Sequence, residues 1–342
     1  MTTLDTPLSI LGGMSANTFL RDYWQKKPLL IRAGLTDFQA PLDADELAGM
    51  AMESEVESRI VIEQGDTPWQ TIKGPFSEET FAQLPKQEWT LLIQAVDHWV
   101  PEASDIVEQF RFIPNWRFDD LMVSFASQGG GVGPHYDNYD VFLIQTQGKR
   151  RWEVGGFFDQ NSPRRPNTPV MIMTQWEPEF SWVLKPGDML YIPPQVGHNG
   201  IGESDDCMTY SVGFRAPSHA EIMRSFTDFV GEKLTSESRY TDPDLGLQEN
   251  SGEITPQAID KVRQIFTGYL ADDAKLAQWL GQYVTDPKYP DLDQTPEEVI
   301  STDQLRTALT ESDLYFVRNE GARFSYSLNS ENELQFFADG CS

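Results

Sequence analysis

The chain has 342 residues, more than one small core usually fills, so we expect a main domain with one or two smaller units. Its 53 acidic and 26 basic residues give a formal net charge of −27, which disfavours free nucleic acid as the primary target and suits a basic protein partner. The absence of an apolar run of ~20 residues, the N-terminus without a basic start and the two isolated cysteines predict no membrane span, no signal peptide and a reducing, cytoplasmic location.

The first hundred residues are predicted to be largely helical. Residues 15–35 indicate a helix over Ala16–Trp24 that leads into a short strand at Leu29–Arg32. From about 43 to 100 the apolar spacing favours helices, most clearly at Pro41–Ala51 and Trp89–Val96.

The pattern changes between about residues 117 and 216, where short β-rich runs are separated by Gly and Pro. The expected strands are Leu121–Phe125, Val141–Ile144, Arg151–Val154, Val170–Met173, Phe180–Leu184, Met189–Ile192 and Met208–Phe214. Strands at this spacing suggest a barrel or jelly roll, so we predict a mainly β, cupin-like core with added helices.

Two segments of this β-rich region carry a metal-ligand pattern. His135 and Asp137 are two residues apart after Pro134, so in an extended backbone both side chains point to one side. His198 follows the short apolar strand Met189–Ile192, which stops at Pro193-Pro194, and is therefore expected on a turn that can fold back over the first segment. Two imidazoles and one carboxylate are the ligand set of a mononuclear Fe(II) oxygenase, and they leave the opposite face of the metal open.

Other residues and metals are weaker candidates. Asp140, five residues after His135, falls on the opposite strand face, and His98 and His219 suit structural positions in or near helices. Structural zinc sites usually use thiolates, and Cys207 and Cys341 lack paired spacing, although catalytic zinc stays an alternative. The glycines of Gly129–Gly133 lack the Lys and Ser/Thr of a phosphate-binding loop and are expected to allow a tight turn beside the metal.

After Pro217 the chain is predicted to be helical again. Apolar stripes mark one helix from Ile222 to Leu234, a second that opens at Thr255-Pro256, and a third from Leu276 to Tyr283. These stripes fit either a cover for the core or a dimer surface. The tail predicts a short helix starting at Thr295-Pro296, then strands at Leu314–Arg318 and Arg323–Leu328.

Several of these segments resemble a known family over roughly residues 15–330. The matching motifs are Asp45–Val56, Trp116–Met122, Gly129–His135, Tyr139–Phe142, Tyr191–Pro194 and Tyr210–Pro217. They are similar to the bacterial ribosomal oxygenases of the JmjC class. The resemblance implies a JmjC double-stranded β-helix in residues 1–216 with an N-terminal helical elaboration, a helical dimerisation region in 217–290, and a winged-helix-like, incomplete C-terminal region in 291–342.

The same resemblance implies an activity and the residues that serve it. It implies an Fe(II)- and 2-oxoglutarate-dependent hydroxylase that uses O2, acts as a homodimer and modifies an arginine side chain of a basic large-subunit ribosomal protein. His135, Asp137 and His198 would hold the metal, and Arg150 and Ser124 the cosubstrate. For Arg150 the residues agree, because strand alternation places it on the face of Trp152, where a guanidinium can bind a carboxylate through two donors.

Substrate recognition is less defined by the sequence. Asp119 or Asp120 would pair with a substrate guanidinium, and Asn138 lies where a substrate-facing residue can occur. A hydroxylase of His or Asn, a histone-type demethylase and a metal-binding cupin without turnover remain alternatives. Arg150 argues against the last, since a binding module has no need of a buried carboxylate anchor.

Overall fold

The structure is a computed structural model that describes residues 5–35, 38–63, 68–168, 170–292, 300–311, 319–329 and 331–342. Its contacts divide the chain into two compact units. The first unit comprises Met1–Ala216 with Gln294–Gly321, and the second Pro217–Asp293 with Ala322–Ser342. Each unit is described by itself.

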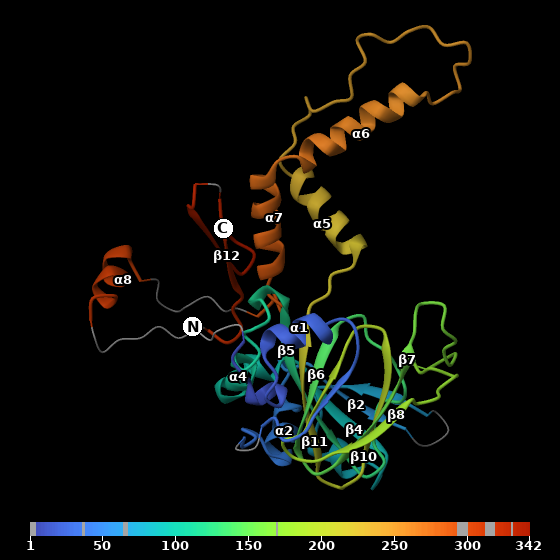
Figure 1. The fold of residues 1–342 in the computed structure, drawn as a ribbon, viewed down its shortest axis with the longest axis vertical. Coiled ribbons are helices and arrows are strands. Elements are labelled where there is room, and N and C mark those ends of the chain that lie inside the picture. Colours follow the sequence, from blue (N-terminus) through green and yellow to red (C-terminus); the bar gives the residue numbers. More distant parts are fainter. Residues whose placement is uncertain are drawn as a thin grey trace. The chain divides into compact units, whose positions relative to one another are not determined.

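Two antiparallel β-sheets form the centre of the first unit (Figure 1). The strands of the larger sheet are β1 (Leu29–Ile31), β2 (Ser58–Ile62), β3 (Gln70–Lys73), β4 (Trp89–Ile93), β5 (Phe118–Ala126), β6 (Asp140–Gln147), β9 (Met189–Ile192) and β11 (Cys207–Phe214). The smaller sheet contains β7 (Arg150–Phe157), β8 (Phe180–Leu184) and β10 (Val196–Gly202). Within the described residues the strand orders are β1-β9-β6-β11-β5-β4-β2-β3 and β10-β7-β8. The mainly β core that the sequence predicts is confirmed.

The side chains of the larger sheet alternate between two apolar clusters. On β6, Phe142 and Ile144 join a large outer cluster, whereas Val141 and Leu143 pack with Trp152 and other residues of the smaller sheet. Both faces of β6 are therefore buried, which explains its uninterrupted apolar sequence. Besides this apolar cluster, alternation along β5 places the buried polar side chains of Asp120 and Ser124 on the inner face of the larger sheet.

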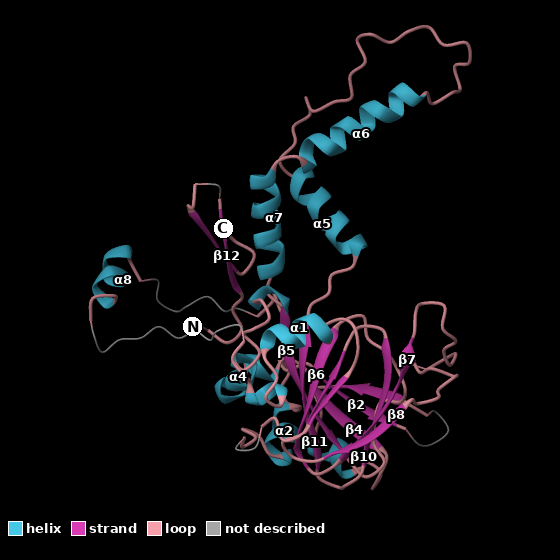
Figure 2. Cartoon of the chain, viewed as in Figure 1, coloured by secondary structure: helices cyan, strands magenta, loops and turns pink. Residues whose placement is uncertain are grey.

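Helices cover the outer face of the larger sheet (Figure 2). They are α1 (Ala16–Asp22), α2 (Ala44–Met50), α3 (Glu78–Ala82) and α4 (Pro101–Glu108), with short 3-10 turns at Ser9–Leu11, Val96–His98 and Asn115–Arg117. Phe19 of α1 packs its ring 5.4 Å from that of Phe142 and 5.0 Å from that of Tyr191. Aromatic packing of this kind fixes the N-terminal segment to the barrel.

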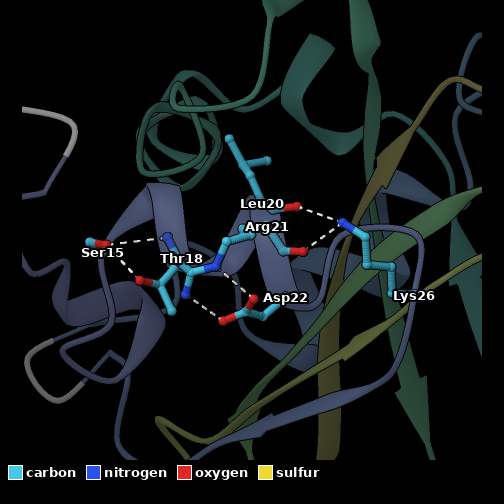
Figure 3. Close-up of polar contacts among 6 residues, drawn as sticks. All are labelled: Ser15, Thr18, Leu20, Arg21, Asp22 and Lys26. Carbon is cyan, nitrogen blue, oxygen red and sulfur yellow. Dashed lines mark hydrogen bonds and ion pairs between the residues drawn. The ribbon is translucent and has the colours of Figure 1, made fainter.

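Local hydrogen bonds set both ends of α1 (Figure 3). The Ser15 hydroxyl accepts from the Thr18 amide at 3.3 Å, as expected of an N-cap. After the last turn, Lys26 Nζ donates to the carbonyls of Leu20 and Arg21 at 3.1 and 2.7 Å. These bonds satisfy carbonyls that the helix leaves open at its C-terminal end, where the chain turns toward β1.

The helical prediction for residues 43–100 is wrong in most of its length. Pro41–Ala51 does contain α2, but Trp89–Val96 forms strand β4, and β2 and β3 precede it. Strand β4 lies between β2 and β5, and its residues Thr90–Ile93 are buried on both faces. A short apolar run that is buried on both sides shows no hydrophobic periodicity, so its sequence does not distinguish a strand from a helix. Here backbone pairing with β5 makes the segment a strand.

The expected strand at Val170–Met173 is also wrong. This segment belongs to the connection between β7 and β8, and in its described part it forms no strand, although an isolated bridge links Arg164 with Met173. The other predicted strands from Leu121 to Phe214 are confirmed within a few residues of their expected bounds.

The second unit contains three helices and a β-hairpin. The helices are α5 (His219–Gly231), α6 (Pro256–Leu270) and α7 (Asp273–Thr285), and the hairpin strands are β12 (Phe324–Leu328) and β13 (Leu334–Ala338). Phe226 and Val230 of α5 pack against Trp279 of α7. Helix α7 also contacts the hairpin, where a side chain on Gly281 would overlap the Phe337 ring at 2.3 Å. The three predicted helices and the strand after Arg323 are confirmed.

Some tail predictions cannot be compared. The strand at Leu314–Arg318 and the helix start at Thr295-Pro296 lie outside the described residues, whereas helix α8 (Thr302–Ala308) is described in the first unit. No helix in the described ranges combines the length and apolarity needed to cross a membrane.

Candidate active site

His135, Asp137 and His198 meet at one end of the barrel, with their ligand atoms within 4.8 Å of one another. Asp137 Oδ2 lies 3.9 Å from His135 Nε2 and 3.6 Å from His198 Nε2. The backbone of His135 pairs with that of His198 through two hydrogen bonds of 3.0 and 2.8 Å. This pairing holds the two histidine side chains together.

Both imidazoles are oriented by backbone carbonyls. Nδ1 of His135 lies 2.9 Å from the Gly133 carbonyl, and Nδ1 of His198 lies 3.0 Å from the Val196 carbonyl. A carbonyl oxygen can only accept, so each Nδ1 carries a proton, and in the neutral form of each ring Nε2 is the nitrogen that can bind a metal. Burial and the neighbouring His135 lower the pKa of His198 to about 4, which keeps its imidazole neutral near pH 7. Neutral imidazole is the form that binds metal.

The position of His198 differs from the sequence-based expectation. It lies inside strand β10 and not on a turn, since the turn ends at Gln195 before the strand begins. Three glycines hide the strand in the sequence, because glycine has low strand propensity. All three are required by close packing: a side chain on Gly197 would overlap the Phe158 ring at 2.4 Å, one on Gly200 the Trp152 indole at 2.6 Å, and one on Gly202 the Ser127 carbonyl at 2.6 Å.

Arg150 lies in the same interior, at the start of β7, and only 5% of its surface is exposed. Its guanidinium lies 5.6 Å from the Trp152 ring centre, on the strand face that alternation predicts, and the Trp152 ring is 5.9 Å from that of His198. Nε of Arg150 donates to Cys207 Sγ at 3.4 Å, whereas the buried Nη2 atom has no hydrogen-bond partner among the described residues. A buried donor without a partner is costly, so this atom points to an anionic ligand.

Polar side chains of the larger sheet continue the site. Ser124 on β5 is buried, and its hydroxyl donates to the Thr209 carbonyl at 3.4 Å. Asp120, four residues earlier on the same face, is 3% exposed and its Oδ2 accepts from Gln94 Nε2 at 2.7 Å and from the Ala95 amide at 3.0 Å. Asp119 is half-buried and, by strand alternation, points to the opposite face.

The residues that follow the metal-ligand pair differ in their contacts. Asn138 is exposed. Tyr139, which the sequence reasoning missed, is 43% exposed, and desolvation of its hydroxyl, followed by the negative charges of Asp137 and Asp120, raises its pKa. The charges of Asp137 and Asp120 therefore both act on the Tyr139 hydroxyl. Asp140 points away, since its carboxylate accepts from Tyr191 Oη at 2.6 Å and Gln25 Nε2 at 2.9 Å.

A carboxyl group outside the predicted set lies beside the glycine segment. Burial and the nearby Glu88 raise the pKa of Glu63 to about 7, while Arg150 acts in the opposite direction. A side chain on Gly131 would lie 2.9 Å from Glu63 Oε1 and 2.4 Å from the Gly200 carbonyl. Nothing in the local sequence of β2 signals this placement, because it depends on how β2 and the glycine segment meet.

Comparisons with known proteins agree with this architecture. Residues 105–222 match the family model of the JmjC domain, and residues 268–342 match that of the ROXA-like winged helix. The chain is 40% identical to the Escherichia coli ribosomal protein uL16 3-hydroxylase over 306 residues, covering 89% of this chain and 80% of the relative. It is 34% identical to a probable ribosomal oxygenase of Haemophilus influenzae over 339 residues, covering 94% and 80%.

Solved structures give the same result. The E. coli ribosomal oxygenase YcfD in complex with cobalt and 2-oxoglutarate superposes with a TM-score of 0.81 at 36% identity, covering 95% of this chain and 84% of that one. The complex with cobalt and succinic acid gives a TM-score of 0.80 at 37% identity, again covering 95% and 84%. The predicted JmjC-type core and the winged-helix character of the C-terminal region are thereby confirmed.

Proposed function

Since this chain belongs to the JmjC-domain ribosomal oxygenases, we propose that it is an Fe(II)- and 2-oxoglutarate-dependent hydroxylase that modifies an arginine side chain of a large-subunit ribosomal protein in the cytoplasm. The observation that carries this proposal is the pairing of a His-Asp-His cluster with a buried, partly unpartnered guanidinium inside one barrel.

His135, Asp137 and His198 would hold the metal. Three ligands that converge from one side leave positions for a bidentate cosubstrate and O2, as oxygenases of this type require. The relative of known structure binds cobalt with 2-oxoglutarate, which supports a divalent metal at this position in the fold. Zinc is disfavoured as the metal, because a simple zinc hydrolase has no use for a buried cationic subsite that binds an anionic cosubstrate.

Arg150 would bind the distal carboxylate of 2-oxoglutarate. Its free Nη2 donor and its burial against Trp152 suit a charge-assisted hydrogen bond in a dry pocket. Ser124 would be a secondary polar contact, although its hydroxyl already donates to a backbone carbonyl. When bound, the iron, 2-oxoglutarate and O2 supply the oxidising power to place one oxygen atom on a C–H bond, with succinate and CO2 as coproducts.

The chain itself would position the substrate. Asp120 lies on the inner face of β5, and its charge and that of Asp137 both act on Tyr139, so these two carboxylates would attract a substrate guanidinium. Asp119 points to the other face, so we assign the cationic subsite to Asp120. Asn138 would contact substrate from the exposed rim. The carboxylate of Asp120 and the net charge of −27 favour arginine over histidine or asparagine as the target.

The second unit would serve assembly. Helix α6 has no buried residue, and it exposes Ile259, Val262, Phe266 and Leu270 at helical spacing. An apolar face of this size on a described helix suits contact with a second copy, so we propose a homodimer through residues 217–290. The regions 1–216, 217–290 and 291–342 stay our proposed division, with α7 shared by the helical region and the winged-helix match.

Mass spectrometry of a substrate protein tests the proposal. Incubation of recombinant uL16 with the enzyme, Fe(II), 2-oxoglutarate and O2 should add the mass of one oxygen atom to one arginine, and His198→Ala should abolish the addition. The surface variant His219→Ala is the matched control and should retain it. Consumption of 2-oxoglutarate without modification would overturn the substrate alone, and no consumption would favour a binding module.

A further inference from the structure

The guanidinium of Arg150 is oriented by a thiol. Cys207, the first residue of β11, is fully buried, and its Sγ accepts from Arg150 Nε at 3.4 Å and from Gln145 Nε2 at 3.5 Å. Arg150 belongs to the smaller sheet, whereas Cys207 and Gln145 belong to the larger one. The contact therefore crosses the barrel interior.

The thiol is itself held by a short chain of hydrogen bonds. Gln145 also donates to the Gln147 carbonyl at 2.7 Å, and its Oε1 accepts from Thr209 Oγ1 at 3.0 Å. The pairing of β11 with β6 shifts by one residue between Met208 and Thr209, directly after Cys207. This irregularity accompanies the placement of two polar side chains of the larger sheet, Gln145 and Cys207, beside Arg150.

This arrangement has a consequence for the guanidinium. A guanidinium has five N–H donors in one plane, so a bond at Nε fixes the rotation of the whole group. A thiol sulfur is only a weak acceptor, so it orients the guanidinium without the strong ion pair that a carboxylate at the same place would form. Trp152 covers the guanidinium, and the Nη2 donor stays without a partner among the described residues.

We propose that Cys207 is a positioning residue that turns the Nη donors of Arg150 toward the distal carboxylate of the cosubstrate. The inference rests on the proposed function, because it assigns Arg150 to that carboxylate. It extends the cosubstrate subsite to a residue of β11 that acts through Arg150.

Direct binding of 2-oxoglutarate tests this role. Calorimetry under anaerobic conditions with Mn(II) in place of iron should show that Cys207→Ala raises the Kd by roughly three- to tenfold, the loss expected for one hydrogen bond. Cys207→Ser keeps an acceptor and should stay within about twofold of the wild type. In turnover, Cys207→Ala should raise the KM for 2-oxoglutarate while kcat at saturating cosubstrate changes little.

Cys341→Ser is the matched control, because Cys341 is exposed. A purely structural role for Cys207 would lower the melting temperature of Cys207→Ala and reduce kcat without a selective rise in Kd, and that result would overturn the proposal. If Cys207→Ala does not fold, Cys207→Val removes the acceptor while it fills the space, and the same rise in Kd is expected.

Arg150→Met separates this inference from the proposed function. If the wild type binds 2-oxoglutarate, Arg150→Met does not, and Cys207→Ala binds like the wild type, only the role of Cys207 is rejected. If the wild type does not bind 2-oxoglutarate, the proposed function fails and the role of Cys207 fails with it.

Discussion

At the scale of single residues, Asp137 is the common neighbour of the two histidines. One of its oxygens, Oδ2, lies within 4 Å of both Nε2 atoms. Asp137→Asn keeps the size of the side chain but removes its charge, so we expect affinity for Co(II) or Mn(II) to fall at least about 100-fold, with hydroxylation lost. Calorimetric titration with metal checks this, and His219→Ala should bind metal like the wild type.

Glu63 provides a pH-dependent prediction. Its pKa is raised from 4.5 to about 7, mainly by burial, so between these values the folded protein keeps a proton that the unfolded chain releases. Stability therefore falls as the pH rises through this window. One pKa unit corresponds to about 1.4 kcal/mol, so the full effect is at most roughly 3 kcal/mol.

Glu63→Gln removes this titration and keeps the shape of the side chain. We expect its melting temperature to rise relative to that of the wild type as the pH increases from about 5 to 8. Thermal unfolding followed by circular dichroism across this range checks the trend. A constant difference between the two proteins at every pH would show that Glu63 ionises normally.

At the scale of elements, the β7–β8 connection forms hydrogen bonds with the segment that carries His135 and Asp137. Tyr136, between the two ligands, accepts a 2.6 Å hydrogen bond from Arg164 Nη2, and the Arg164 guanidinium lies 5.4 Å from the Tyr136 ring centre. The amide of Met173 donates to the Pro134 carbonyl at 2.9 Å. A connection that contains no regular strand thus fixes the backbone beside the metal ligands.

Loss of the hydrogen bond between Arg164 and Tyr136 should weaken metal binding. Tyr136→Phe and Arg164→Met each lose the same hydrogen bond, so each should raise the Kd for Co(II) by about three- to tenfold. The double variant should be little worse than either single one, because the two changes remove one shared contact. Additive losses in the calorimetric titration would show that the residues act independently.

At the scale of the whole molecule, α6 is the candidate for contact between copies. Val262→Glu combined with Phe266→Glu places two charges on its exposed apolar face, so we expect the dimer to dissociate. Light scattering after size-exclusion chromatography should show half the wild-type mass, with cosubstrate consumption retained in the first unit. Gln264→Glu lies on the opposite side of α6 and should leave the mass unchanged; a wild-type monomer would reject the proposed dimer.

Several features followed from the sequence alone. The metal-ligand set needs only a few residue types at suitable spacing, so His135, Asp137 and His198 could be selected without a structure. Strand alternation also placed Arg150 beside Trp152 and excluded Asp140, because the period of two holds for any extended segment. The helices of the second unit carried full amphipathic patterns, and their positions were predicted closely.

Only the tertiary structure decided the rest. Strand β4 was predicted as a helix because it is buried on both faces and shows no periodicity. Strand β10 was missed because of its glycines, which are required by the rings beside Gly197 and Gly200 and by the Ser127 carbonyl beside Gly202. Cys207, Glu63 and Arg164 reach the site from segments far apart in the chain. Their roles depend on contacts across the barrel or between loops, and a local pattern of residues contains no information about such contacts.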